Sequence, residues 1–106
     1  MENQHRKITG YRELNQAEID LMNEIKALGP LVEAVLDKVQ SHLSAQYQAT
    51  IIEQDGAEPL DPLVRDQELL KRLDDATPGR FHSLAKTEFQ TGLMYLTRAV
   101  AQPTFF

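Results

Sequence analysis

The sequence contains no cysteine among its 106 residues, and this absence removes several classes of protein at once. Disulfide scaffolds and thiolate metal sites are excluded, because both require cysteine side chains. No run of apolar residues approaches the ~20 that a membrane-spanning helix needs, and the N-terminal MENQHRKITG is too polar for a signal peptide. A single domain in the cytoplasm, without a membrane partner, is therefore the simplest expectation.

The residue patterns that accompany common catalytic sites are also absent. The five glycines are scattered, and no glycine-rich phosphate loop precedes a helix. The histidines His5, His42 and His82 lie in separate segments, and no HExxH pattern supplies a metal site. Ser41 and Ser44 flank His42 in an expected helix, which is more typical of a solvated face, and no third group orients a base. We therefore predict a binding protein with no catalytic residues, no metal and no cofactor.

The net charge of −5 is concentrated in one stretch of the chain. Residues 53–75 hold eight acidic and three basic side chains, so the remainder is neutral. A protein that neutralises many phosphates of a nucleic-acid duplex is usually basic over a broad face. The pattern therefore argues against DNA or RNA duplexes as partners, and it leaves room for a local site that binds a small anion.

Apolar residues recur at spacings of three and four, which predicts an all-α fold. A short first helix is expected to begin after Asn15, and Glu18 is placed for a capping box. Gly29-Pro30 is expected to end this helix, so that it forms the second part of the segment 5–29. A long second helix is expected over 30–54. Thr77-Pro78 is typical of an N-cap and first turn, and it predicts a last helix to about Ala101 within the segment 78–103.

The acidic segment between the long helices, 55–77, fits two interpretations. Its leucines predict a short amphipathic helix, whereas its acidity is equally typical of a variable insertion; these leucines are Leu63, Leu69, Leu70 and Leu73. The last helix carries apolar residues over more than one stripe, which favours packing on two partners, one of them another chain. A short first helix and two long helices do not cover one another fully, so we expect an oligomer.

Residues near the N-terminus supply parts of a nucleotide-binding site. Tyr11 lies in the one markedly basic stretch of the chain, and stacking of a base on such a ring is worth about 1–3 kcal/mol. Lys26 lies on the flank of the first helix's apolar stripe, where its ammonium suits a phosphate. From the residues alone, a lone tyrosine more often packs, and a helical lysine near Met22 more often extends along the apolar surface to water. Both interpretations stay open at this point.

Two long strings resemble the anti-CBASS protein 2 family of phages: HRKITGYRELNQAEIDLMNEIKALG over 5–29, and FQTGLMYLTRAVAQP over 89–103. The similarity extends over about 79–103 at the C-terminal end, whereas 44–78 is longer and more acidic than is usual in the family. The resemblance implies a hexamer of interlocked helical protomers that sequesters cyclic oligonucleotides in the cytoplasm of the infected bacterial host. Cyclic dinucleotides such as cyclic GMP–AMP would lie between paired protomers, and cyclic trinucleotides such as cyclic tri-adenylate where three protomers meet.

The resemblance also implies roles for individual residues. The base-stacking tyrosine of the family motif falls on Tyr11 and the phosphate-binding lysine on Lys26, and both are intact. We therefore predict a cyclic dinucleotide site formed by Tyr11, Lys26 and Arg12. For the cyclic trinucleotide site we predict Arg80, Thr9 and Gly10, although the unusual middle segment enters the last helix just before Arg80.

Two other functions compete with sequestration. A helical adaptor would bind a host protein through the wide apolar face, and Phe105 and Phe106 at the C-terminus favour it. A phosphodiesterase would destroy the signal instead of hiding it, but the metal ligands of such enzymes are missing.

Overall fold

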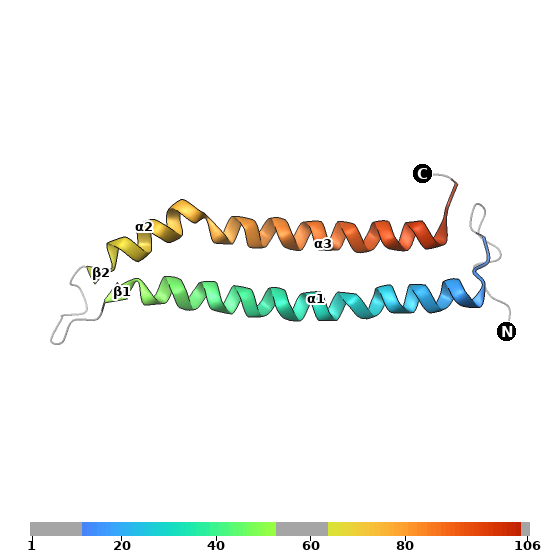
Figure 1. Cartoon of the computed structure of the whole chain (residues 1–106), viewed down its shortest axis with the longest axis horizontal. Helices are drawn as coiled ribbons and strands as arrows, with labels where there is room; N and C mark the ends of the chain where they lie inside the picture. Colours follow the sequence, from blue (N-terminus) through green and yellow to red (C-terminus); the bar gives the residue numbers. More distant parts are fainter. Residues whose placement is uncertain (1–11, 53–63, 105–106) are drawn as a thin grey trace. The chain divides into compact units, whose positions relative to one another are not determined.

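The structure of the chain, a computed structural model, describes residues 12–52 and 64–104 (Figure 1). The elements in chain order are α1 (Gln16–Ala49), β1 (Ile51–Ile52), β2 (Val64–Arg65), α2 (Gln67–Ala76) and α3 (Pro78–Ala101). The described residues are almost entirely helical, which confirms the predicted all-α class. Two compact units divide the chain: the first is Met1–Glu33 with Thr87–Phe106, and the second is Ala34–Lys86. Helices α1 and α3 each contribute one part to each unit.

Helix α1 begins with the capping box that its sequence predicts. The side-chain oxygen Oδ1 of Asn15 accepts a hydrogen bond of 2.9 Å from the backbone N–H of Glu18. In return, Oε1 of Glu18 accepts one of 2.9 Å from the backbone N–H of Asn15. These bonds satisfy two backbone donors that a helix start leaves without an intrahelical partner.

The predicted break at Gly29-Pro30 is wrong, because α1 continues through it as one helix of 34 residues. Pro30 lacks an N–H, so it removes the helical hydrogen bond to the carbonyl of Lys26, and its ring crowds the same carbonyl. The half-buried positions continue at spacings of four and three on both sides of it; they are Met22, Ile25, Gly29, Val32 and Leu36. Because the stripe continues without a phase shift, packing along it offsets the roughly 3 kcal/mol by which an interior proline disfavours a helix. The expected short first helix is therefore the first part of a long one.

The predicted end of the long helix near Gln54 is also wrong, because α1 ends at Ala49 and β1 follows. β1 pairs antiparallel with β2, with Ile51 opposite Arg65. Thr50 is fully buried at this junction; its hydroxyl donates to the carbonyl of Tyr47 at 2.6 Å and accepts from Nη1 of Arg65 at 3.1 Å. The backbone carbonyl of Thr50 accepts a bond of 2.6 Å from the N–H of Asp66. These local bonds replace the next helical turn, which is why the helix stops before its apolar pattern does.

The short amphipathic helix expected in the acidic segment is present as α2. Asp66 is its N-cap, and its side-chain Oδ1 accepts a bond of 3.1 Å from the backbone N–H of Leu69. Leu73 is only 2% exposed, whereas the acidic residues Asp74 and Asp75 beside it are exposed. Leu63 lies outside the described residues. Burial of one leucine face explains why an acidic segment adopts a helix here.

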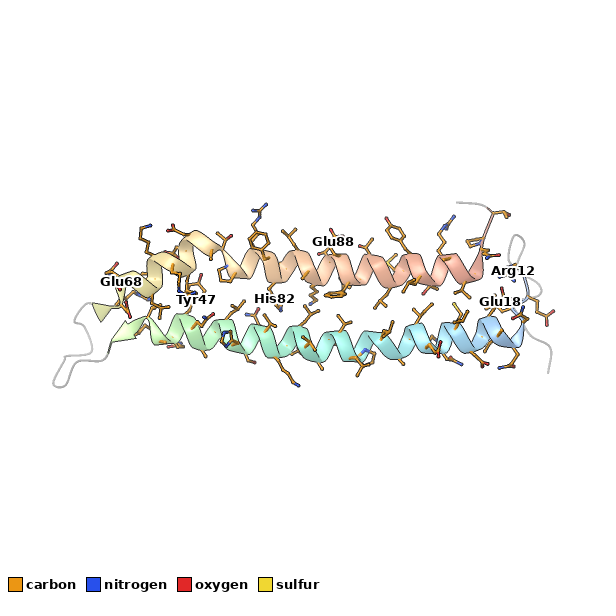
Figure 2. The ribbon with its side chains drawn as sticks, viewed as in Figure 1. Arg12, Glu18, Tyr47, Glu68, His82 and Glu88 are labelled. Atoms are coloured by element: carbon orange, nitrogen blue, oxygen red, sulfur yellow. The ribbon has the colours of Figure 1, made fainter. Side chains whose placement is uncertain are left out.

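Helix α3 has the bounds that its sequence predicts, Pro78–Ala101. Thr77 ends α2 in a left-handed conformation (φ 46°), and its N–H donates to the carbonyl of Leu73 at 3.0 Å. Within the second unit, Nε2 of His82 donates to the carbonyl of Leu36 at 2.8 Å and so joins α3 to α1 (Figure 2). No helix in the described ranges combines the length and the apolar character that crossing a bilayer demands.

Candidate functional site

Arg12 joins the start of α1 to the end of α3 within the first unit (Figure 2). Its Nε donates to the carbonyl of Ala101 at 3.0 Å, and its Nη2 donates to the carbonyl of Val100 at 2.7 Å. Nη1 donates to Oε1 of Glu18 at 2.9 Å, and Nη2 is paired with Oε2 of the same carboxylate. The guanidinium therefore caps two C-terminal carbonyls of α3 and forms a bidentate ion pair with the residue that caps α1.

The carboxylate of Glu18 is the centre of this hydrogen-bond network. Hydrogen bonding from the Arg12 guanidinium, and then from the backbone N–H of Asn15, lowers the pKa of Glu18 to about 2. The same pair raises the pKa of Arg12 above its ordinary value, through its hydrogen bond to Glu18. Both groups are therefore charged at neutral pH, and each compensates the other's charge.

Lys26 lies on α1 in the first unit, eight residues beyond Glu18, which is about 12 Å along a helix axis. Its side chain is exposed, and no hydrogen-bond or ion-pair partner for it occurs in residues 12–52 and 64–104. Pro30 also leaves the carbonyl of Lys26 without its helical donor. Within the described part of the chain the Lys26 ammonium thus has no counter-charge, and an exposed ammonium suits an anionic ligand.

Arg80 lies in the first turn of α3, within the second unit. It is exposed, and its guanidinium carbon lies 5.8 Å from the centroid of the neighbouring Phe81 ring. A cation at the start of a helix adds to the positive end of the helix dipole, so the local field there favours an anion. Thr9, Gly10 and Tyr11 lie outside the described residues.

The structure thus brings only some of the predicted residues into one unit: Arg12 and Lys26 share the first unit, and Arg80 belongs to the second. The contacts of Arg12 with Val100 and Ala101 are not predicted from the sequence, because these residues are separated from Arg12 by 88 and 89 positions in the chain. Local spacing does not reveal such a contact. Glu18 was identified as a cap, but nothing in its spacing from Arg12 indicated a bidentate ion pair.

Comparison with known proteins places the chain in a family. The sequence model described as "Acb2/Tad1, hairpin domain" matches residues 3–101. Anti-CBASS protein 2 of Pseudomonas phage JBD67 is 42% identical to this chain over 109 aligned positions, which cover 97% of both proteins. The match includes both ends of the chain, where Arg12 and Lys26 lie and where α3 ends. The chain therefore belongs to the Acb2/Tad1 hairpin-domain family.

Proposed function

We propose that this protein counters the CBASS defence of an infected bacterium by binding cyclic dinucleotides, and also cyclic trinucleotides, and sequestering them uncleaved. The observation that carries the proposal is the family match over residues 3–101, together with a relative that is named Anti-CBASS protein 2. The free ammonium of Lys26 supports it, because a phosphate ligand would supply the counter-charge that this lysine lacks in the described residues. The protein would act inside the infected cell, where the signal is made.

In the proposed dinucleotide site, Tyr11 stacks on a base, Lys26 binds a phosphate, and Arg12 completes the site. A cyclic dinucleotide has two bases and two phosphates. Two stacks at about 1–3 kcal/mol each and two charged hydrogen bonds at about 1.5–3 each give roughly 5–12 kcal/mol before association entropy is subtracted. Nanomolar binding requires about 12 kcal/mol. The surface of one protomer, with one Tyr11 and one Lys26, supplies only half of this sum and falls well short. We therefore propose that two protomers enclose the ligand, each contributing one Tyr11 and one Lys26, and that the exclusion of water strengthens these contacts.

Exposed apolar side chains support an oligomer. In the first unit, Leu21 and Leu31 of α1 are 47% and 65% exposed, and Met94 and Tyr95 of α3 are each 69% exposed. Large apolar side chains gathered on exposed helix faces are typical of protein interfaces. We propose that copies of the chain cover these residues in a hexamer. A pair of protomers matches the two-fold pseudo-symmetry of a cyclic dinucleotide.

For cyclic trinucleotides we propose a separate site where three protomers meet. Arg80 would supply the cation, and the backbone near Thr9 and Gly10 would contribute neighbouring polar groups. The position of Arg80 at the positive end of α3 supports an anion-binding role.

Native mass spectrometry with a mixed pool of cyclic oligonucleotides tests the proposal. We expect a hexamer that retains cyclic dinucleotides and trinucleotides, and heating the complex should release them intact. Tyr11→Ala should lose the dinucleotide and stay oligomeric. Linear products would indicate a phosphodiesterase, and a monomer that binds none of these ligands would refute the proposal.

The exposed apolar residues of α1 and α3 also fit a second function, that of a helical adaptor for a host protein. The two functions differ in their response to cyclic nucleotides. A ligand at 100 times its Kd stabilises the folded protein by about 2.7 kcal/mol, so a sequestering protein should show a marked rise in melting temperature. An adaptor should show none.

A further inference from the structure

We propose that Phe81 is a positioning residue for the cyclic trinucleotide site, because its ring holds the guanidinium of Arg80 in place before a phosphate binds. This inference rests on the proposed function, since it assigns a supporting residue to the arginine of that site. Both residues lie in the first turn of α3 and within the second unit. In this role Phe81 acts on the ligand only through Arg80.

The contact between the two side chains carries the inference. The guanidinium carbon Cζ of Arg80 lies over the Phe81 ring, 5.8 Å from the ring centroid. This distance is within the ~6 Å over which the face of an aromatic ring attracts a cation. Consecutive residues of a helix do not face each other, so the contact requires the long arginine side chain to turn toward the ring. The ring therefore selects among the conformations that an exposed arginine otherwise samples.

This contact leaves the hydrogen-bonding groups of Arg80 free. A guanidinium has five N–H donors, and in residues 12–52 and 64–104 those of Arg80 have no hydrogen-bond or ion-pair partner. Arg65 in the same unit differs, because its Nη1 donates to the hydroxyl of Thr50 at 3.1 Å. An aromatic ring orients a cation without supplying an acceptor atom or a negative charge. Arg80 therefore keeps its donors and its charge for a phosphate.

The exposure of Phe81 supports this role over one in packing within the chain. Its side chain is 59% exposed, so burial in the second unit does not account for an aromatic ring at this position. An aliphatic side chain lacks the ring electrons that attract a cation. An arginine restrained before the ligand arrives loses less conformational entropy on binding. The affinity for cyclic tri-adenylate should therefore depend on the ring of Phe81.

Phe81→Leu and Phe81→Tyr separate this role from packing, because leucine keeps an apolar side chain and tyrosine keeps the ring. In isothermal titration calorimetry, Phe81→Leu should bind cyclic tri-adenylate about two- to fivefold more weakly, as expected for loss of an exposed cation–π contact. Phe81→Tyr should bind it as tightly as the unsubstituted protein. Both variants should keep their affinity for cyclic GMP–AMP and their oligomeric state in native mass spectrometry. Equal weakening by leucine and tyrosine, or loss of the oligomer in Phe81→Leu, would overturn the inference.

A double-mutant cycle tests whether Phe81 acts through Arg80. In the Arg80→Ala background no guanidinium remains to be held, so adding Phe81→Leu should cause no further loss of affinity for cyclic tri-adenylate. The same loss in both backgrounds would mean that the ring contacts the ligand itself, and it would overturn the assignment of a positioning role.

Phe89→Leu is the matched control for Phe81→Leu. It makes the same change on the same helix, at a ring that is 50% exposed and that has no cation over it among the described residues. We expect it to leave the affinity for cyclic tri-adenylate unchanged, and an equal loss in both variants would count against Phe81. If the unsubstituted protein binds no cyclic tri-adenylate, the trinucleotide part of the proposed function fails as well. If it binds and Phe81→Leu binds equally well, only the inference fails.

Discussion

His82 on α3 donates a hydrogen bond from Nε2 to the main-chain carbonyl of Leu36 on α1, across 2.8 Å and 46 positions of sequence. The imidazole is half-buried, so this bond forms partly shielded from water. A bond between a side chain and a helical carbonyl fixes one residue of α3 against one residue of α1. In the second unit, His82 therefore sets the register of the two helices at that point.

His82→Leu should lower the free energy of unfolding by about 1 kcal/mol, which is the usual net contribution of one intramolecular hydrogen bond. Urea denaturation at one fixed protein concentration measures this change, because the stability of an oligomer depends on concentration. His42→Leu is the control, since His42 is exposed on α1. Equal destabilisation by both variants would show that the bond to Leu36 contributes nothing.

Thr77 has φ 46°, in the left-handed region that β-branched residues rarely adopt. Glycine adopts this conformation without the steric penalty, which is about 1–2 kcal/mol for other residues. Because glycine also gains freedom in the unfolded chain, Thr77→Gly should raise the free energy of unfolding by a smaller amount, roughly 0.5–1 kcal/mol. Thr77→Ala, which keeps a Cβ, should give no such gain. Thermal or urea unfolding measures the stability of both variants. A Thr77→Gly variant less stable than Thr77→Ala would contradict the expected strain.

Pro30 interrupts the hydrogen-bond ladder of α1 without ending the helix. Substitution by alanine restores the N–H that the Lys26 carbonyl lacks and should raise the free energy of unfolding by about 1–3 kcal/mol. Pro30→Gly restores the same donor but adds the backbone entropy of glycine, so its gain should be smaller. Chemical denaturation of the three proteins should rank alanine above glycine above proline. A loss of stability in Pro30→Ala would mean that the chain requires a proline at this point.

Local sequence patterns are enough to predict where a helix begins. Thr77-Pro78 predicted the start of α3, and Asn15 with Glu18 predicted the start of α1, because caps and prolines act within one turn. The same local rule failed at Pro30, where the continuous stripe of half-buried residues outweighs one lost hydrogen bond. The β1–β2 pair was missed because two residues per strand produce no alternating pattern.

In the candidate site, the sequence predicts the exposure of one residue but not the long-range contacts of another. The exposure of Lys26 follows from its place beside the apolar stripe, and the sequence predicts it. The engagement of Arg12 by Val100 and Ala101 does not follow from any spacing, because it depends on how the two ends of the chain fold together in the first unit. Most donors of this arginine are occupied in the folded chain, and the sequence pattern does not predict it.

The Glu18–Arg12 pair should make the free energy of unfolding smaller at low pH than at neutral pH. The pKa of Glu18 is about 2 in the folded protein and near its ordinary value of 4.5 in the unfolded chain. A folded pKa below the unfolded one means that the contribution is fully present above about pH 5 and is lost as the pH falls toward 2. The difference in unfolding free energy between the unsubstituted protein and Glu18→Gln should therefore shrink between pH 6 and about pH 2. A difference that stays constant over this range would indicate that the pair contributes no pH-dependent stability.

The two proposed sites should separate under single substitutions. Lys26→Ala removes the cation proposed for the dinucleotide phosphates and should weaken cyclic GMP–AMP binding by at least tenfold, which corresponds to about 1.4 kcal/mol. Arg80→Ala should weaken cyclic tri-adenylate binding by a similar factor and spare cyclic GMP–AMP. Isothermal titration calorimetry of both variants with both ligands gives the four affinities.

Lys38→Ala is the matched control, because Lys38 is another exposed lysine on α1. It removes the same charge as Lys26→Ala from the same helix, so it accounts for any general electrostatic attraction between the protein and an anionic ligand. We expect it to leave both affinities within twofold of the unsubstituted protein. Loss of both ligands in either Lys26→Ala or Arg80→Ala would show that one site binds both classes of cyclic nucleotide, since a residue confined to one pocket has no means of weakening the other.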